Sequence, residues 1–126
     1  MSAQISVQLP VESLGTTFGG GPMACAAIEA VLDAIESQQL LGRVRHLGAL
    51  IRASCIVGPV CACQGAGLLI GLRTTRPAKE IQAELLECGV LAGTASDPQV
   101  LRLLPPFILE DEHVELLRDA LRELPA

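Results

Sequence analysis

The sequence predicts an α+β fold, in which helices cover one face of a small, mostly antiparallel sheet of about three to four strands. Two observations support this class. The apolar residues recur at helical spacing over residues 22–55, and the later segments contain short apolar runs of strand length. The resulting order is helix, helix, strand, strand, helix, strand, strand, helix, which is typical of a layered α+β domain. A glycine-rich loop and a long helical segment precede the sheet.

The composition excludes several classes of function. Half of the 126 residues are hydrophobic, 18% are charged and the net charge is −5. These values are typical of a folded domain and argue against polyanionic partners. Phe18 and Phe107 are the only aromatic residues, so the stacking platforms of nucleic-acid-binding proteins are missing. We therefore expect no nucleic-acid partner.

Hydropathy and cysteine usage indicate the compartment. The chain contains no apolar run long enough to span a bilayer, and its first residues lack a signal-peptide pattern. We expect no membrane association and a cytoplasmic location, which five scattered cysteines also suit. The high apolar content indicates that another domain or subunit covers part of the surface, so we expect a homo-oligomer or a partner chain.

Cys61 and Cys63 are the only closely spaced cysteine pair. No histidine or second close pair completes a tetrahedral site, so we expect no metal. Because residues i and i+2 of a strand point the same way, both thiols are predicted to face one apolar side as buried structural cysteines.

The loop from Gly15 to Gly21 is the first candidate site. Residues 1–14 before it alternate weakly and could form a short strand. Glycines permit a close backbone approach, and Pro22 suits the first turn of the helix that follows. The N–H groups at that helix start favour an anion, with phosphate as the obvious candidate, although many such loops only connect elements. Thr16 and Thr17 would act as hydroxyl donors.

Each remaining element has a local signal. Two helices are predicted over residues 22–39 and 40–55, with Gly42 marking a bend between them. Arg43, Arg45 and Arg52 form a basic stripe that we interpret as a solvated helix face. Strands are predicted at 57–63 and 68–73 around a turn at 64–67, at 90–92, and at 100–104 after a polar turn at 94–99. A helix is predicted over 78–88 with Ile81, Leu85 and Leu86 inward and Gly89 as its cap. A last helix runs from about 110 to 123 with Val114, Leu117 and Leu121 on one stripe.

Arg102 is the most informative charged residue. It lies within an apolar strand, directly before Leu103, Leu104 and two prolines. If it is buried, its guanidinium must be paired or face a ligand, and its shape suits a carboxylate. If the strand is at an edge, Arg102 simply points to water. His46, His113 and Lys79 have no sequence context that favours catalysis.

Three motifs together resemble a known family. They are the Gly15–Ala24 loop, the Gln64–Leu68 turn, and the strand from Leu101 that ends in Pro105 and Pro106. In this order and spacing they resemble the C-terminal part of class III, ornithine/acetylornithine-type, pyridoxal-phosphate-dependent aminotransferases. The resemblance covers almost all of residues 10–125. Departures occur at Leu14, where the family often has His, at Gly21, where Asn is usual, and at Gln64, where Arg is common.

The resemblance implies roles for three residues. Thr17 would contact the phosphate of pyridoxal 5'-phosphate across a dimer interface, Thr16 would lie near the substrate, and Arg102 would bind a substrate carboxylate. It also implies amino-group transfer between an amino acid and a 2-oxo acid, within arginine biosynthesis. Residues 1–21 would form an N-terminal segment with the loop, and residues 22–126 a small C-terminal aminotransferase-like domain.

The family's large domain, which carries the lysine that binds the cofactor, is not among the 126 residues. We therefore expect the chain to be the C-terminal domain of an aminotransferase, encoded as a fragment or split gene, without catalytic residues of its own and inactive by itself. The alternative is a non-catalytic dimerisation or small-ligand-binding module derived from the same fold.

Overall fold

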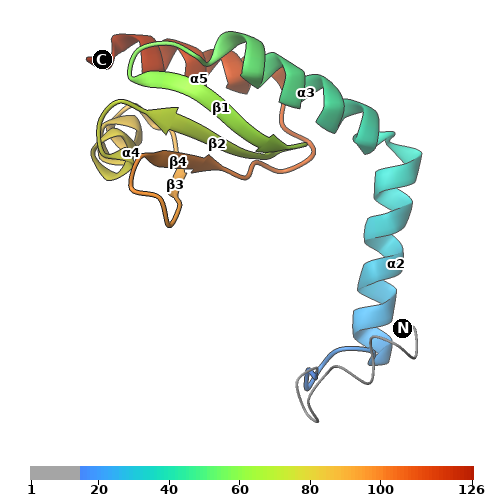
Figure 1. Cartoon of the computed structure of the whole chain (residues 1–126). Coiled ribbons are helices and arrows are strands. Elements are labelled where there is room, and N and C mark those ends of the chain that lie inside the picture. Colours follow the sequence, from blue (N-terminus) through green and yellow to red (C-terminus); the bar gives the residue numbers. More distant parts are fainter. Residues whose placement is uncertain (1–14) are drawn as a thin grey trace, which may run out of the picture. The chain divides into compact units, whose positions relative to one another are not determined.

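A computed structural model describes residues 15–126, so the possible strand within residues 1–14 lies outside the described part. The chain divides into two compact units, one ending at Ser37 and the other running from Gln38 to Ala126 (Figure 1). The described elements are, in order, α2 (Pro22–Ser37), α3 (Leu40–Ser54), β1 (Val60–Ala66), β2 (Leu69–Thr74), α4 (Ala78–Glu87), β3 (Gly93–Thr94), β4 (Val100–Leu103) and α5 (Asp111–Glu123). This order confirms the one predicted from the sequence.

The predicted division of the first two helices between residues 39 and 40 agrees with the structure, but the bend expected at Gly42 is not there. α2 ends at Ser37 and α3 begins at Leu40, whereas Gly42 lies inside the first turn of α3. The residue before α3, Gln39, has a left-handed φ of 52°. Non-glycine residues rarely adopt this conformation, so residue type alone does not predict it at Gln39.

The second unit contains a four-stranded antiparallel sheet in the order β1-β2-β4-β3. Figure 1 shows α3 and α5 side by side across one face of this sheet. The predicted α+β class, with a small antiparallel sheet and helices on one face, is confirmed. β1 and β2 form a hairpin in which Ala66 pairs with Leu69. The predicted turn at 64–67 was therefore too long, because Gln64 is within the ladder and the connection is only Gly67 and Leu68. Gly67 has a φ of 55°, which suits such a tight turn.

A β-bulge in β1 corrects the prediction for the cysteine pair. Val60 pairs with Thr74 and Ala62 with Arg73, so Cys61 is an extra residue with no partner of its own. The bulge breaks the simple alternation of the strand. Cys61 is therefore exposed, and its thiol donates to the carbonyl of Arg73 at 3.3 Å. Cys63 instead packs half-buried against the core, so the two thiols are not a buried pair.

β3 lies further along the chain than predicted. It comprises Gly93 and Thr94 in place of residues 90–92, because the pairing partners on β4 are Arg102 and Leu101. The segment before β3 is held by Gln82 of α4, whose side-chain amide donates to the carbonyl of Ala92 at 2.8 Å. Cross-strand register, rather than the apolar run itself, sets this boundary.

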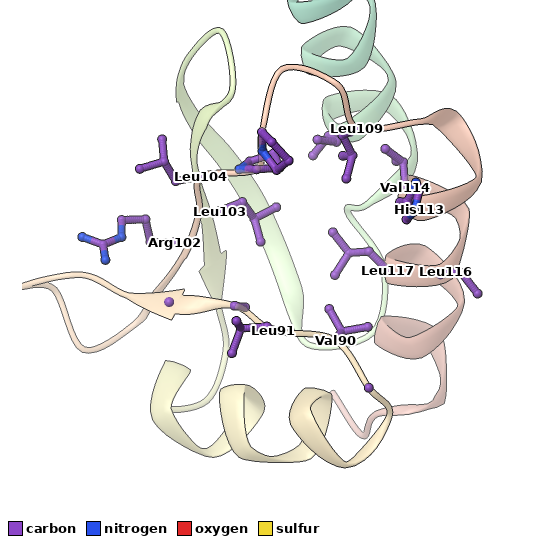
Figure 2. Close-up of a pocket in the computed structure, with 16 residues that line it drawn as sticks. Val90, Leu91, Arg102, Leu103, Leu104, Leu109, His113, Val114, Leu116 and Leu117 are labelled. Carbon is purple, nitrogen blue, oxygen red and sulfur yellow. The ribbon is translucent and has the colours of Figure 1, made fainter. Parts of the chain in front are cut away.

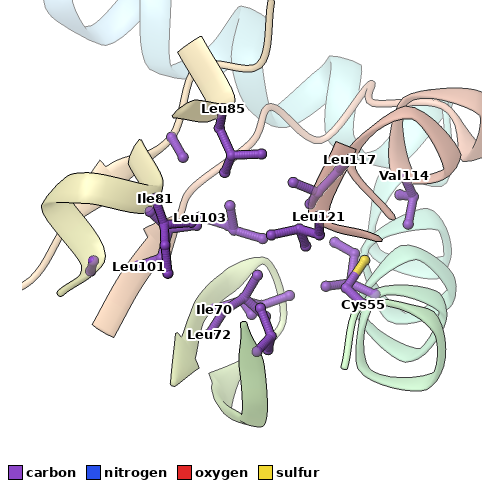
Figure 3. Close-up of a cluster of buried hydrophobic side chains, with 14 of the residues drawn as sticks. Cys55, Ile70, Leu72, Ile81, Leu85, Leu101, Leu103, Val114, Leu117 and Leu121 are labelled. Atoms are coloured by element: carbon purple, nitrogen blue, oxygen red, sulfur yellow. The ribbon is translucent and has the colours of Figure 1, made fainter. Parts of the chain in front are cut away.

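The hydrophobic core lies on the sheet face that carries Ile70, Leu72, Leu101 and Leu103 (Figure 3). Helices α3, α4 and α5 supply the remaining buried side chains, chiefly Leu47, Ile51, Ile81, Leu85, Val114, Leu117 and Leu121. The predicted inward residues of α4 and α5 are confirmed except for Leu86, which is 59% exposed. The buried stripe of α4 is Ala78, Ile81 and Leu85, so Ala78 is buried where Leu86 was expected.

The basic stripe of α3 is less solvated than predicted. Arg43 donates to the carbonyl of Leu109 at 2.6 Å, which links α3 to the segment before α5. Arg52 donates to the carbonyl of Gly65 at 2.8 Å, which links α3 to the β1–β2 hairpin. Two of the three arginines in the stripe therefore tie elements together.

Candidate functional site

The glycine-rich loop leads directly into α2, as predicted. Pro22 is the first helical residue, and the first helical hydrogen bond runs from the Cys25 amide to the Gly21 carbonyl at 3.0 Å. A β-carbon at Gly19 would collide with the Thr16 side chain, and Gly20 has a φ of 80°. The backbone of Gly20 thus favours glycine, and a side chain at position 19 would force the Thr16 side chain to move.

Thr16 and Thr17 are both exposed on this loop. Within residues 15–126 neither hydroxyl has a hydrogen-bond partner. The N–H groups of the first α2 turn also lack intrahelical acceptors, as at any helix start. The loop therefore presents free donors that suit an anionic group.

Arg102 lies on β4, an inner strand with β2 on one side and β3 on the other. The strand is therefore not the edge strand considered from the sequence, although the side chain does point to solvent, as that alternative expected. Leu101 and Leu103 point into the core, and the alternation of the strand turns Arg102 to the opposite, open face of the sheet. The side chain is exposed.

The guanidinium of Arg102 has no carboxylate within 4.0 Å among the described residues. Arg73, Arg76 and Arg118, in contrast, pair with Asp97, Glu84 and Asp119 respectively. Arg102 thus combines a rigid position in the sheet with an unpaired charge, which suits a carboxylate ligand.

An apolar groove of about 640 Å³ lies next to β4, and the sequence reasoning did not predict it. Val90, Leu103, Leu109, Val114 and Leu117 are among its lining residues. Figure 2 shows Leu103 pointing into this groove, whereas Arg102 points away from it. Arg102 and Gly93 are themselves among the lining residues, so the groove reaches the strand that carries the guanidinium, although most of its lining is apolar.

The other titratable side chains have structural contacts. Arg76 donates two hydrogen bonds to Glu84, at 2.9 and 2.7 Å, and these bonds lower the pKa of the Glu84 carboxyl. His46 lies 2.7 Å from Asp111, and His113 accepts a hydrogen bond from the Glu110 amide as part of the capping box of α5.

Acid–base and metal chemistry have no evident centre in the described part. Lys79 is exposed on α4 and is not among the residues that line the groove. Across residues 15–126 no three His, Cys, Asp or Glu side chains come together as potential metal ligands.

The structure places the predicted residues in two separate units. Thr16 and Thr17 belong to the first and Arg102 to the second, so each is described within its own unit. In both units the candidate residues offer binding groups rather than reacting groups.

Comparison with known proteins identifies the family. The family model described as aminotransferase class-III matches residues 1–124. The chain belongs to the class-III aminotransferases.

Curated relatives indicate a branch of this family. Acetylornithine aminotransferase 1 of Bordetella pertussis is 42% identical over 108 residues, and the acetylornithine aminotransferase of Streptomyces coelicolor is 41% identical over 111 residues. These matches cover 82% and 85% of this chain but only 27% of either relative. The chain thus spans about a quarter of the length of the relatives it matches.

Solved structures agree on the fold. The acetylornithine aminotransferase of Elizabethkingia anophelis matches 95% of this chain with a TM-score of 0.75 at 27% identity, and the match covers 35% of that protein. An amine transaminase from an uncultivated Pseudomonas species, solved in a pyridoxal-phosphate-bound form, matches 88% of this chain and 29% of its own, with a TM-score of 0.72 at 28% identity. Pyridoxal phosphate is thus the cofactor of the intact family. None of the helices in residues 15–126 has the length and apolar character to cross a membrane.

Proposed function

We propose that this chain forms the C-terminal part of an acetylornithine/ornithine-type aminotransferase, which transfers an amino group between an amino acid and a 2-oxo acid. The cytoplasm and arginine biosynthesis are the proposed setting. The unpaired guanidinium of Arg102 is the observation that carries this proposal. It is held on a central strand, and both substrate classes of such an enzyme contain a carboxylate that it would bind through two parallel hydrogen bonds.

The glycine-rich loop fits one part of pyridoxal 5'-phosphate. Thr17 would donate its hydroxyl to the phosphate, and Thr16 would lie near the substrate. The free hydroxyls and the helix start directly after the loop support these roles. When bound, the cofactor stabilises negative charge that develops on the substrate during amino transfer.

The rest of the cofactor does not fit the described residues. Lys79, the only lysine of the sequence, is exposed on α4 and lacks the surroundings that activate a cofactor-binding lysine. We propose that a large domain, on a partner chain or in a longer protein, supplies this lysine, and that the chain alone has no transaminase activity.

Reconstitution tests the main proposal. The Bordetella pertussis relative, truncated before its matched segment, would be mixed with this chain, pyridoxal phosphate, acetylornithine and a 2-oxo acid. We expect turnover from the mixture and none from either part alone. Arg102→Leu should lower kcat/KM roughly 10- to 100-fold, because it removes charged hydrogen bonds to the substrate.

Arg45→Leu is the matched control, since Arg45 is exposed on α3 and bonds to no other described residue. Full turnover with Arg102→Leu would contradict the carboxylate role. Turnover by the chain alone would contradict the need for a large domain.

A cofactor titration tests the loop separately. We expect borohydride to leave no covalent pyridoxal phosphate adduct on Lys79 by mass spectrometry. In the reconstituted mixture, Thr17→Val should weaken cofactor binding about tenfold, because one hydrogen bond to a charged phosphate is lost. Equal affinities of the wild type and the Thr17→Val variant would exclude the proposed phosphate contact.

The exposed surface of α2 favours the second candidate, a dimerisation or ligand-binding module. None of its residues is buried, although Met23, Ile28, Val31 and Leu32 are large and apolar. Such a surface is typical of a segment covered by another chain. Self-association without any reconstitution of activity would favour this module over the enzyme part.

A further inference from the structure

We propose that Gln64 and Gly93 are positioning residues that set the direction in which Arg102 meets a carboxylate. This inference rests on the proposed carboxylate role of Arg102 and adds two residues that neither the motif nor its spacing assigns. Gln64 closes the space on one side of the Arg102 side chain, and Gly93 opens the space on the other side.

The strand register places these residues in one row across the open face of the sheet. Gln64 of β1 pairs with Gly71 of β2, Gly71 pairs with Arg102 of β4, and Arg102 pairs with Gly93 of β3. Residues directly opposite one another in antiparallel strands project from the same face. Arg102 therefore stands between two glycines, and Gln64 is the next side chain beyond Gly71.

The Gln64 side chain fills the space above Gly71. A β-carbon on Gly71 would lie 3.1 Å from Cγ and 3.3 Å from Nε2 of Gln64. The Cγ1 of Val100 would lie 2.9 Å from the same point. An Arg102 side chain that leaned towards β2 would meet Gln64 and Val100, so this direction is closed.

The space above Gly93 is filled by Arg102 itself. A β-carbon on Gly93 would lie 3.3 Å from both Nε and Nη2 of Arg102. Any side chain at position 93 would compete with the guanidinium for this place. The absence of a side chain there lets the guanidinium lie over β3, and this fixes where its charge is presented.

The test measures the guanidinium directly, by NMR of the full chain at pH 6. The Nε–Hε signal of Arg102 is assigned by its loss in Arg102→Leu. In the wild type we expect a nuclear Overhauser effect from this proton to the α-protons of Gly93 and none to those of Gly71. Titration with sodium acetate, against sodium chloride of equal ionic strength, should shift the signal.

Three variants test whether the side chains at positions 64 and 93 set the direction of the Arg102 side chain. Gly93→Val should remove the contact with position 93 and weaken the acetate response about fivefold, because the guanidinium is displaced. Gln64→Ala removes one of the two side chains that close the direction towards β2, so it should create a contact between Arg102 and the α-protons of Gly71 that is weak because Val100 remains. Gln64→Met restores the bulk without the amide and should restore the wild-type contact. Gly42→Ala, which meets no atom within 4 Å, is the control for a glycine change, and a matching unfolding midpoint shows that each variant folds.

The outcomes are distinguishable. Wild-type contacts and acetate responses in Gly93→Val and Gln64→Ala would overturn the positioning proposal and leave the carboxylate role intact. The expected contacts without any acetate response in the wild type would instead overturn the carboxylate role. If Gly93→Val does not fold, the two Gln64 variants provide the test. In that case, a Gln64→Ala variant whose Arg102 contacts are the same as in the wild type overturns the proposal.

Discussion

Arg76 and Glu84 form the best-defined ion pair of the second unit. The Arg76 side chain is only 22% exposed, and its two terminal nitrogens donate to the two Glu84 oxygens. These hydrogen bonds are the main reason why the pKa of Glu84 is lowered. The attraction between the two charges acts in the same direction, and desolvation of the carboxyl opposes it. Folded Glu84 therefore binds a proton less readily than unfolded Glu84, so its contribution to stability is present near neutral pH and is lost as pH falls.

Glu84→Gln should therefore destabilise the protein at pH 7 but have a shrinking effect below about pH 4.3, the ordinary pKa of a glutamate. Urea unfolding between pH 3 and 7 measures this difference. Glu87→Gln, an exposed glutamate at the end of the same helix, is the control. A stability difference between the wild type and Glu84→Gln that stays constant down to pH 3 would show that the charge of Glu84 is not responsible.

The cysteines differ in reactivity because of their surroundings. Burial raises the pKa of the Cys55 thiol, and it also raises the pKa of the half-buried Cys63 thiol. Cys61, in contrast, is exposed on the bulge. A thiol with a raised pKa forms less of the reactive thiolate. Iodoacetamide at pH 8 should modify Cys61 faster than Cys63, and Cys55 only after unfolding in urea, as followed by peptide mass spectrometry. Equal rates at Cys55 and Cys61 in the folded protein would contradict the described burial.

At the scale of elements, α3 approaches the β1–β2 hairpin through Gly48. A β-carbon there would lie 2.7 Å from the Gly67 carbonyl oxygen. Next to this contact, Arg52 donates to the carbonyls of both Gly48 and Gly65. The close approach and the hydrogen bond to Gly65 hold the hairpin against the helix, while the bond to Gly48 lies within α3 and positions the Arg52 side chain.

Gly48→Ala should destabilise the protein by about 1–3 kcal/mol, because the added methyl group overlaps the hairpin backbone. Gly42→Ala on the same helix meets nothing within 4 Å and should instead stabilise it by up to about 1 kcal/mol. Chemical denaturation of both variants gives the comparison. Similar effects of the two substitutions would mean that the close contact at Gly48 is not maintained in solution.

The elements were predictable where their signals are local. Pro22 starts α2, and Gly89, with a φ of 79°, follows α4 and donates to the Leu86 carbonyl, as the sequence indicated. The left-handed conformation of Gln39 and the bulge at Cys61 were not predictable. A left-handed glutamine is rare, and a bulge depends on the strand that pairs with it rather than on the bulged residue.

In the candidate site, too, local signals were predictable from the sequence and features that depend on the sheet were not. Thr16, Thr17 and Arg102 were recognisable by residue type and by their motifs. The orientation of Arg102 was not, because it depends on which face of the sheet the core occupies. Gln64 appeared to belong to a turn, and only the register of β1 against β2 brings it into the row with Arg102.

At the scale of the whole molecule, the core belongs to the second unit alone. All of its clustered residues lie between Leu47 and Leu121, and α2 has no buried residue. A chain of residues 38–126 should therefore fold cooperatively, with the same urea midpoint as the full chain. Circular dichroism and urea titration of both chains test this. A large loss of stability in the shorter chain would show that the first unit contributes to the fold.

The strict alternation of β4 has a consequence for how this protein can change during evolution. Leu101 and Leu103 face the core while Arg102 faces outward, so a one-residue slip of β4 would bury the charge and expose both leucines. Insertions or deletions near this strand are therefore tolerable only where the exposed turn at residues 95–99 absorbs them. Homologues should vary in length at this turn and keep the Leu-Arg-Leu order intact, and aligning them at the turn tests this.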